Sequence, residues 1–412
     1  MRAQAVAGGL CLALLARAGT VRVDNSEALH RALRAATPGA VILLEPGEYR
    51  GHFRAGKLRA DADRPTVVGA ADPQRPPVLR GRRQCIHLSN VRHLILRDLV
   101  LADATINGLN IDDGGSFDTP SQHVVLENLV VRDVGSGGNH DGIKLSGVDD
   151  FLLIGCTVEG WGSGGSAVDM VGCHRGLIAR CRFRHSRGRG ASGVQAKGGS
   201  SQVVLWRCRF AAAGQRAVNI GGSTGEDYRR PPGATWEARQ VVVVGNTFVG
   251  SKAPLAFVGC RDCRASYNTI YRPTGWLFRI LREGRKPHTV LTRENTLRRN
   301  IVVWRWREVA ATVNIGPNTA PRTFRFQANW WYCEDRPRRS RPVLPAEEAE
   351  PVTGRDPGIR IDGIRVQATE AAHHGADAPR AEEAFAAAAA ELVPWALREF
   401  RDRTVETEPG PE

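Results

Sequence analysis

Polar and charged side chains occupy equivalent positions in four segments near the middle of the chain, which begin at residues 143, 168, 194 and 218. In each segment they alternate with apolar residues, and alternate side chains of a strand point to opposite faces. If the segments are parallel strands stacked ~4.8 Å apart, one face of the stack carries a file of polar groups within reach of one sugar ring or ion. The file contains Lys144, Asp169, Gln195, Lys197 and Asn219.

A file of this composition could catalyse β-elimination on a uronic-acid polymer. The reaction needs a group that neutralises the sugar carboxylate, a base that removes the neighbouring proton, and a group that stabilises the leaving oxygen. More polar residues surround the file, and a long turn over 221–240 adds others. The alternative is a solvated sheet face without a ligand. The residues that we expect to bind substrate are His140, Lys144, Gln195, Asn219, Arg187, Arg189, Tyr228 and Arg229.

A self-similar pattern runs through the middle of the chain and must position these residues. Its bend positions recur at intervals of 22 to 38 residues, each after a short run of alternating apolar residues. Short strands at this spacing indicate a solenoid, in which each turn buries its apolar face against its neighbours. We therefore predict an all-β fold, a parallel β-helix. The bend residues are Asp98, Asn128, Cys156, Cys181, Cys208, Asn246, Asn268, Asn300 and Asn329.

The bend residues are expected to point into the solenoid. There a stacked asparagine can bond the backbone of the next turn, and a cysteine fills the same small space. We therefore assign the cysteines to core packing, with zinc binding and disulfides as alternatives. Cys260 and Cys263 form a CxxC motif without a second pair, which is a weak metal signal.

The chain divides into three parts. Residues 1–18 have a basic start, a short apolar run and a small-x-small pattern, which predicts a signal peptide and a secreted or periplasmic protein. Residues 19–335 form the solenoid, beginning with a short capped helix over 25–36 that plugs its open end. Residues 336–412 form a linker and a tail that is partly helical and partly irregular. No later stretch is long and apolar enough to span a membrane.

The chain carries a formal net charge of +14 over 412 residues. Such an excess favours polyanionic partners, although arginine used for solubility would give the same balance. Export and the lack of a nucleic-acid-binding motif argue against nucleic acid. The expected partner is an acidic polysaccharide, bound by a monomer.

The opening helix, the segment PGAVILLEPGEY at 38–49 and the bend repeats resemble the pectate-lyase-like right-handed parallel β-helix superfamily. The start is most similar to the chondroitinase B/alginate lyase group. That resemblance implies a right-handed coil and a polysaccharide lyase. In the group a lysine base and an arginine act from neighbouring turns, often with Ca²⁺, and Lys197 and Arg216 match this pair. It also implies Asp141 and Asp169 as Ca²⁺ ligands, although the Glu-x-Glu pair typical of the group is missing.

Two other functions fit the same fold. The run from Asn139 to Ile143 is similar to a run of the polygalacturonases, so a glycoside hydrolase with Asp141 and Asp169 as its carboxyl pair is one alternative. Other polygalacturonase motifs, Gly-His-Gly and Arg-Ile-Lys, are missing. The second alternative is a non-catalytic carbohydrate-binding β-helix. Such a protein should show aromatic platforms beside the polar file, but the tryptophans lie mostly from Trp276 onward.

Overall fold

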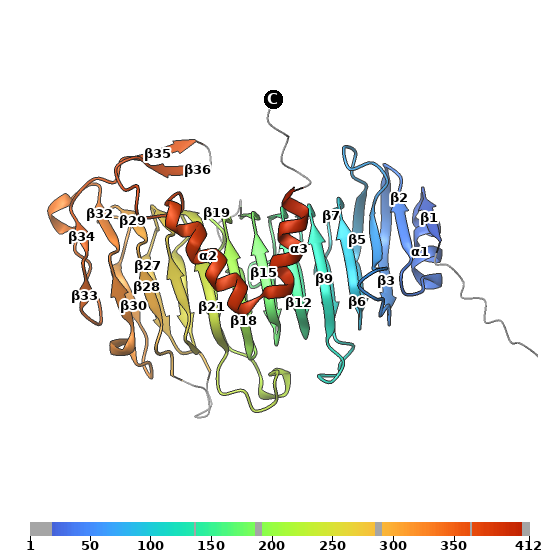
Figure 1. The fold of residues 1–412 in the computed structure, drawn as a ribbon, viewed down its shortest axis with the longest axis horizontal. Helices are drawn as coiled ribbons and strands as arrows, with labels where there is room; N and C mark the ends of the chain where they lie inside the picture. Colours follow the sequence, from blue (N-terminus) through green and yellow to red (C-terminus); the bar gives the residue numbers. More distant parts are fainter. Residues whose placement is uncertain (1–18, 136, 186–191, 285–290, 363–364, 406–412) are drawn as a thin grey trace, which may run out of the picture.

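The computed structural model describes residues 19–135, 137–185, 192–284, 291–362 and 365–405. In these ranges the chain forms a long parallel β-helix whose coils stack along one axis (Figure 1). A regular coil contributes three strands, and each strand pairs in parallel with its counterparts in the coils before and after it. The predicted all-β solenoid is therefore confirmed.

One ladder of strands makes a 14-stranded sheet. Its members are β1 (Thr20–Val23), β2 (Val41–Leu44), β4 (Thr66–Ala70), β6 (Arg92–Arg97), β9 (Ser121–Glu127), β12 (Val148–Ile154), β15 (His174–Ala179), β18 (Ser200–Trp206), β21 (Ala238–Val244), β24 (Cys260–Arg261), β25 (Arg264–Ser266), β28 (Thr296–Arg298), β31 (Arg325–Gln327) and β33 (Glu348–Ala349).

The second sheet has 20 strands and contains two ladders, which β3 (Glu48–Gly56) and β5 (Val78–Ser89) join. The first, here called the site ladder, comprises β8 (Leu109–Asp112), β11 (Ile143–Ser146), β14 (Ser166–Val171), β17 (Ser192–Lys197), β20 (Arg216–Gly221), β23 (Ala253–Val258), β27 (Trp276–Leu281) and β30 (Ala311–Ile315). The other comprises β7 (Val100–Ala102), β10 (Val130–Arg132), β13 (Thr157–Glu159), β16 (Arg182–Arg184), β19 (Arg209–Ala211), β22 (Thr247–Val249), β26 (Thr269–Tyr271), β29 (Ile301–Trp304), β32 (Trp330–Cys333) and β34 (Val352–Thr353).

The N-terminal end of the coil is covered by α1 (Ser26–Ala35). Asn25 caps this helix, since its Oδ1 accepts a hydrogen bond of 2.9 Å from the backbone N–H of Ala28. Leu29 and Leu33 are buried in the main core, where they shield the first coil from water. The helix predicted over 25–36 is thus confirmed.

The interior bends carry stacks of identical residues. The side-chain Oδ1 of Asn268 accepts a 3.0 Å bond from the backbone N–H of Asn246, and Asn300 does the same for Asn268. Cys156, Cys181 and Cys208 are fully buried in the earlier coils. All eight cysteines in the described ranges are buried and free, in agreement with a packing role.

The inward orientation predicted for Asp98 and Asn128 is wrong. Both have positive φ, 57° and 51°, and the Nδ2 of Asn128 donates to Oδ1 of Asp98 on the outside of the coil. The following residues, Leu99 and Leu129, fill the interior instead, at 1% and 0% exposure. Leucine is apolar and needs no hydrogen-bond partner when it is buried, so it takes the interior position. The Asp or Asn before it takes the αL position of the turn, a conformation that these two residue types tolerate.

The strand ladders continue beyond residue 335, where the sequence predicts a linker. Phe326 of β31 pairs with Glu348 of β33, and Trp330 of β32 pairs with Val352 of β34. The tail then forms a hairpin of β35 (Ile359–Asp362) and β36 (Arg365–Ala368), followed by α2 (Pro379–Leu392) and α3 (Pro394–Val405).

The two C-terminal helices lie across the outer face of the 14-stranded sheet, over β12, β15, β18 and β21 (Figure 1). Phe385 of α2 stacks on Trp206 with 4.5 Å between the ring centroids. Leu152, Leu177 and Val204 of the sheet belong to the same buried cluster. These apolar residues sit at outward positions, so the helices are needed to remove them from water.

In the described part of the chain, no helix combines the length and apolar character needed to cross a membrane. The signal peptide predicted over 1–18 lies outside the described residues.

Candidate functional site

The predicted polar file lies on the outer face of the site ladder. Lys144 pairs in register with Asp169, Asp169 with Gln195, and Gln195 with Asn219. Their apolar neighbours belong to the main core, so the file points away from the interior. Lys197 lies on the same face, two residues after Gln195. The alternation in the sequence, read in the correct register, was therefore sufficient to predict the file.

Two lysines and two aspartates form the centre of the site. The Nζ of Lys144 donates to Oδ2 of Asp169 and lies 3.6 Å from Oδ2 of Asp141. The Nζ of Lys197 lies 3.2 Å from Oδ1 of Asp169. The carboxylates are almost fully covered, at 3% and 1% side-chain exposure, whereas the lysines keep 19% and 16%. A ligand on this face therefore meets the two amines first.

Asp141 is fixed at the edge of this cluster by backbone contacts. Its N–H donates to Oδ1 of Asn107 at 2.9 Å, and its Oδ1 accepts from the N–H of Ser166 at 2.8 Å. Burial, reinforced by the charge of Asp169, raises the pKa of Asp141 to about 6. Burial lowers the pKa of Lys144, but Asp169 and Asp141 outweigh it, so the net pKa is above the usual value and this side chain stays cationic.

Arg216 begins the next strand, β20, and points along the same face. Its Nη1 donates to Oδ1 of Asn219 at 3.3 Å, and its Nη2 is ion-paired with Glu283. Asn219 and Gln195 both donate to the carbonyl of Gly221, at 3.3 Å each. These contacts hold the polar ends of three side chains in place beside Lys197.

The long turn over 222–237 borders the site but does not place every predicted residue there. Arg229 is 6% exposed, and its Nη2 donates to Oε1 of Glu237 at 2.8 Å, with Glu237 itself 1% exposed. The substrate-binding role predicted for Arg229 is therefore not supported, because a buried ion pair already uses its charge. Tyr228 is 69% exposed on the turn and remains open to a ligand.

His140 lies in the connection before β11 and is partly buried, with Nδ1 unpartnered among the described residues. Arg187 and Arg189 lie outside the described residues, so their predicted binding role stays a prediction.

The residues predicted to bind Ca²⁺ do not fit that ion as they are arranged. Ca²⁺ takes six to eight oxygen ligands. Here the ammonium of Lys144 contacts both Asp141 and Asp169, and Lys197 covers the remaining oxygen of Asp169. Among the described residues, no group of three or more His, Cys, Asp or Glu side chains could hold a metal ion. The carboxylates are instead neutralised by lysine.

Four further polar residues of the file were not predicted from the sequence. Each stands between two apolar residues, as Lys144 does, so the same alternation could have revealed them. His87 pairs in register with Asn110, which itself pairs with Lys144. The Nε2 of His87 lies 2.7 Å from Oδ2 of Asp112. The four are His87, Asn110, Arg279 and Asn314.

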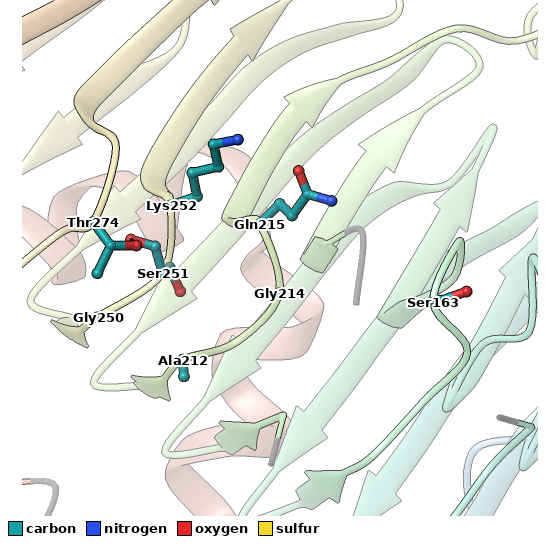
Figure 2. Close-up of a pocket in the computed structure, with 8 residues that line it drawn as sticks. All are labelled: Ser163, Ala212, Gly214, Gln215, Gly250, Ser251, Lys252 and Thr274. Atoms are coloured by element: carbon teal, nitrogen blue, oxygen red, sulfur yellow. Dashed lines mark hydrogen bonds between the residues drawn. The ribbon is translucent and has the colours of Figure 1, made fainter. Parts of the chain in front are cut away.

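A cavity of about 660 Å³ lies beside the beginnings of the site strands, and its lining does not include Lys144 or Asp169. Its lining includes Ser163, Gln215, Ser251, Lys252 and Thr274 (Figure 2). Lys252 and Gln215 come from the connections that precede β23 and β20. The cavity therefore extends the polar face toward later coils.

His174 is buried beside the ion pair of Arg230 and Asp149, which fixes the long turn to the coil. Arg230 binds Asp149 through two 2.7 Å hydrogen bonds, and His174 lies in register beside Asp149. The Nδ1 of His174 is 2.9 Å from Oγ of Ser201, and burial lowers its pKa to about 4.

Because the unfolded state binds the proton more readily, the stability conferred by neutral His174 is complete above pH ~6.5. It should fall as the pH drops from ~6.5 to ~4, by about 3 kcal/mol. Denaturant unfolding of the wild type and of His174→Asn across this range measures the effect. The variant should lack that part of the pH dependence. The prediction would be contradicted if the free energy of unfolding changed with pH to the same extent in the variant and the wild type.

A lacto-N-biosidase from Eubacterium ramulus aligns with a TM-score of 0.51 and 13% identity, over 80% of this chain and 64% of the enzyme. An alginate lyase from Paenibacillus sp. str. FPU-7 aligns with a TM-score of 0.49 and 16% identity, over 74% and 98%. The pectate lyase Pel9A aligns with a TM-score of 0.48 and 12% identity, over 71% and 73%.

The likeness shows the fold, a parallel β-helix. No family model matches the sequence, and no curated protein does. A likeness at this level of identity shows the fold alone, which leaves the reaction open.

Proposed function

We propose that this protein is an exported polysaccharide lyase that cleaves a uronic-acid-containing polysaccharide by β-elimination. The observation that carries the proposal is the pair of amines, Lys144 and Lys197, held side by side by Asp169 on the outer face of the site ladder. Both requirements of the reaction at the acidic sugar, a positive charge for the carboxylate and a base for the neighbouring proton, are met by these two side chains.

In the proposed reaction, Lys144 keeps its charge and binds the sugar carboxylate, which makes the adjacent C–H bond more acidic. Lys197 is the base, and its amine takes that proton when it is in the neutral form. The electron pair forms a carbon–carbon double bond as the glycosidic C–O bond breaks, and the leaving oxygen takes up the proton from Lys197, which regenerates the free amine. Arg216 stabilises the negative charge on the carboxylate or the leaving oxygen, and Asn219 orients the sugar by hydrogen bonding.

Two roles follow for the buried aspartates. Asp169 positions both amines and does not touch substrate, since only 1% of its side chain is exposed. Asp141 is also covered, which argues against the hydrolase alternative, because the two carboxyls of a glycosidase must flank the bond that they cleave. No step requires Ca²⁺.

A panel of uronic-acid polymers tests the proposal, with each polymer incubated with and without a chelator. We expect ultraviolet absorbance from unsaturated sugar ends on at least one polymer, unchanged by the chelator because lysine supplies the positive charge. New reducing ends without that absorbance would establish hydrolysis instead. Loss of activity on chelation would show that a metal ion takes part.

A further inference from the structure

Two further cationic side chains, Lys252 and Arg279, follow Lys197 along the site ladder. Together with Trp276, which lies between them, they form a group that we call the distal patch. Lys252 immediately precedes β23, while Trp276 and Arg279 belong to β27. These strands follow β20 in the ladder, so the patch continues the face that carries Arg216. Glu283, the acid ion-paired with Arg216, also lies close enough to Arg279 to act on its charge.

The indole of Trp276 organises the cations. The Nζ of Lys252 lies 5.2 Å from the ring centroid, and Cζ of Arg279 lies 4.4 Å from it. The Nε of Arg279 donates to Oδ1 of Asn314 at 2.8 Å, which fixes the guanidinium plane. Burial and the nearby charge of Arg216 lower the pKa of Arg279, so a bound anion would relieve a repulsion already present.

The patch adjoins the 660 Å³ cavity through Lys252, which contributes to both. Figure 2 shows the side chains of Lys252 and Gln215 extending from neighbouring turns at this cavity. Ser251, another lining residue, is 7% exposed, and its hydroxyl has no hydrogen-bond partner among the described residues. A cavity of this volume with a positive rim is suited to a polar ring that carries a negative charge.

We propose that the distal patch and this cavity form a subsite for an acidic sugar of the bound polysaccharide, remote from the bond that is cleaved. The inference rests on the proposed function. From β17, which carries Lys197, to β27 there are three strand steps, or roughly 14 Å. A ligand must therefore extend over several sugar rings to reach both places, so the subsite acts on long chains.

The test is calorimetric titration of uronic-acid oligosaccharides of increasing length into the wild type, Arg279→Gln and a matched control. Arg298→Gln is that control, because Arg298 is exposed on β28 of the 14-stranded sheet. We expect Arg279→Gln to weaken the binding of long oligomers at least ten-fold, with a loss that shrinks as the oligomer shortens. The control should bind like the wild type, and a neutral glucan should not compete.

Equal affinities of Arg279→Gln and wild type for long oligomers would overturn the subsite, as would a loss that is the same at every length. A wild type that binds no acidic oligosaccharide overturns both the subsite and the proposed function. Length-dependent binding without elimination leaves the subsite standing and overturns the lyase alone.

Discussion

Replacing Lys197 with alanine should reduce the rate of elimination by roughly 10²- to 10⁴-fold, the usual contribution of a general base. The physical reason is that Nζ of Lys197 lies beside the carboxylate that also holds Lys144, on the face where a sugar carboxylate would bind. Its side chain is 16% exposed, so the amine is accessible without a change in the fold. Initial rates with the best polymer of the panel measure the effect.

The control for this variant is Lys57→Gln, since Lys57 is exposed and directly follows β3 near the N-terminal end. It should retain full activity. The thermal unfolding midpoint of Lys197→Ala should stay close to that of the wild type, which separates a lost base from a lost fold. Full activity of Lys197→Ala would remove the base assignment.

Replacing Asp169 with alanine should lower the free energy of unfolding by about 3–5 kcal/mol, the cost of breaking a buried ion pair. Asp169 is 0% exposed and is the shared partner of Lys144 and Lys197. Without it, Lys144 keeps a charge in a largely buried position with only Asp141, at 3.6 Å, to balance it. Denaturant unfolding provides the measurement.

A second variant separates the lost pair from the lost volume. In Lys144→Met combined with Asp169→Leu, apolar groups replace the closest pair of charges, so part of the stability should return. The recovery should be incomplete, because Asp141 and Lys197 lose their ion-pair partners in this variant. A loss below about 1 kcal/mol in Asp169→Ala would show that the pair is not effectively buried.

Alternation of polar and apolar residues was enough to predict both the solenoid and the polar file. The period of two decides which side chains enter the core, and repeats of similar length stack in register because each coil must pair with the next. The same rule failed at Asp98 and Asn128, where the polar residue of the bend takes the αL position and a leucine enters the core. The repeat pattern could not distinguish the two arrangements, because either the polar residue or the leucine after it can occupy the interior position of the bend.

The partners of charged side chains could not be predicted in this way. Arg229 and Glu237 are eight residues apart and Arg230 and Asp149 are 81 apart, and nothing in their spacing distinguishes a buried pair from two surface charges. The C-terminal helices were predicted, but not the sheet that they cover. That docking depends on outward apolar residues such as Trp206, which the repeat pattern by itself assigns to the surface.

The sequence by itself determined the architecture and the face on which the ionic groups gather, because both follow from the local alternation repeated coil after coil. Only the tertiary structure decided what those groups do to one another. It placed the ammonium of Lys144 between two carboxylates that the sequence had assigned to Ca²⁺, and it closed Arg229 inside its own turn. Charge interactions depend on distances and burial in three dimensions, and neither is encoded in spacing along the chain.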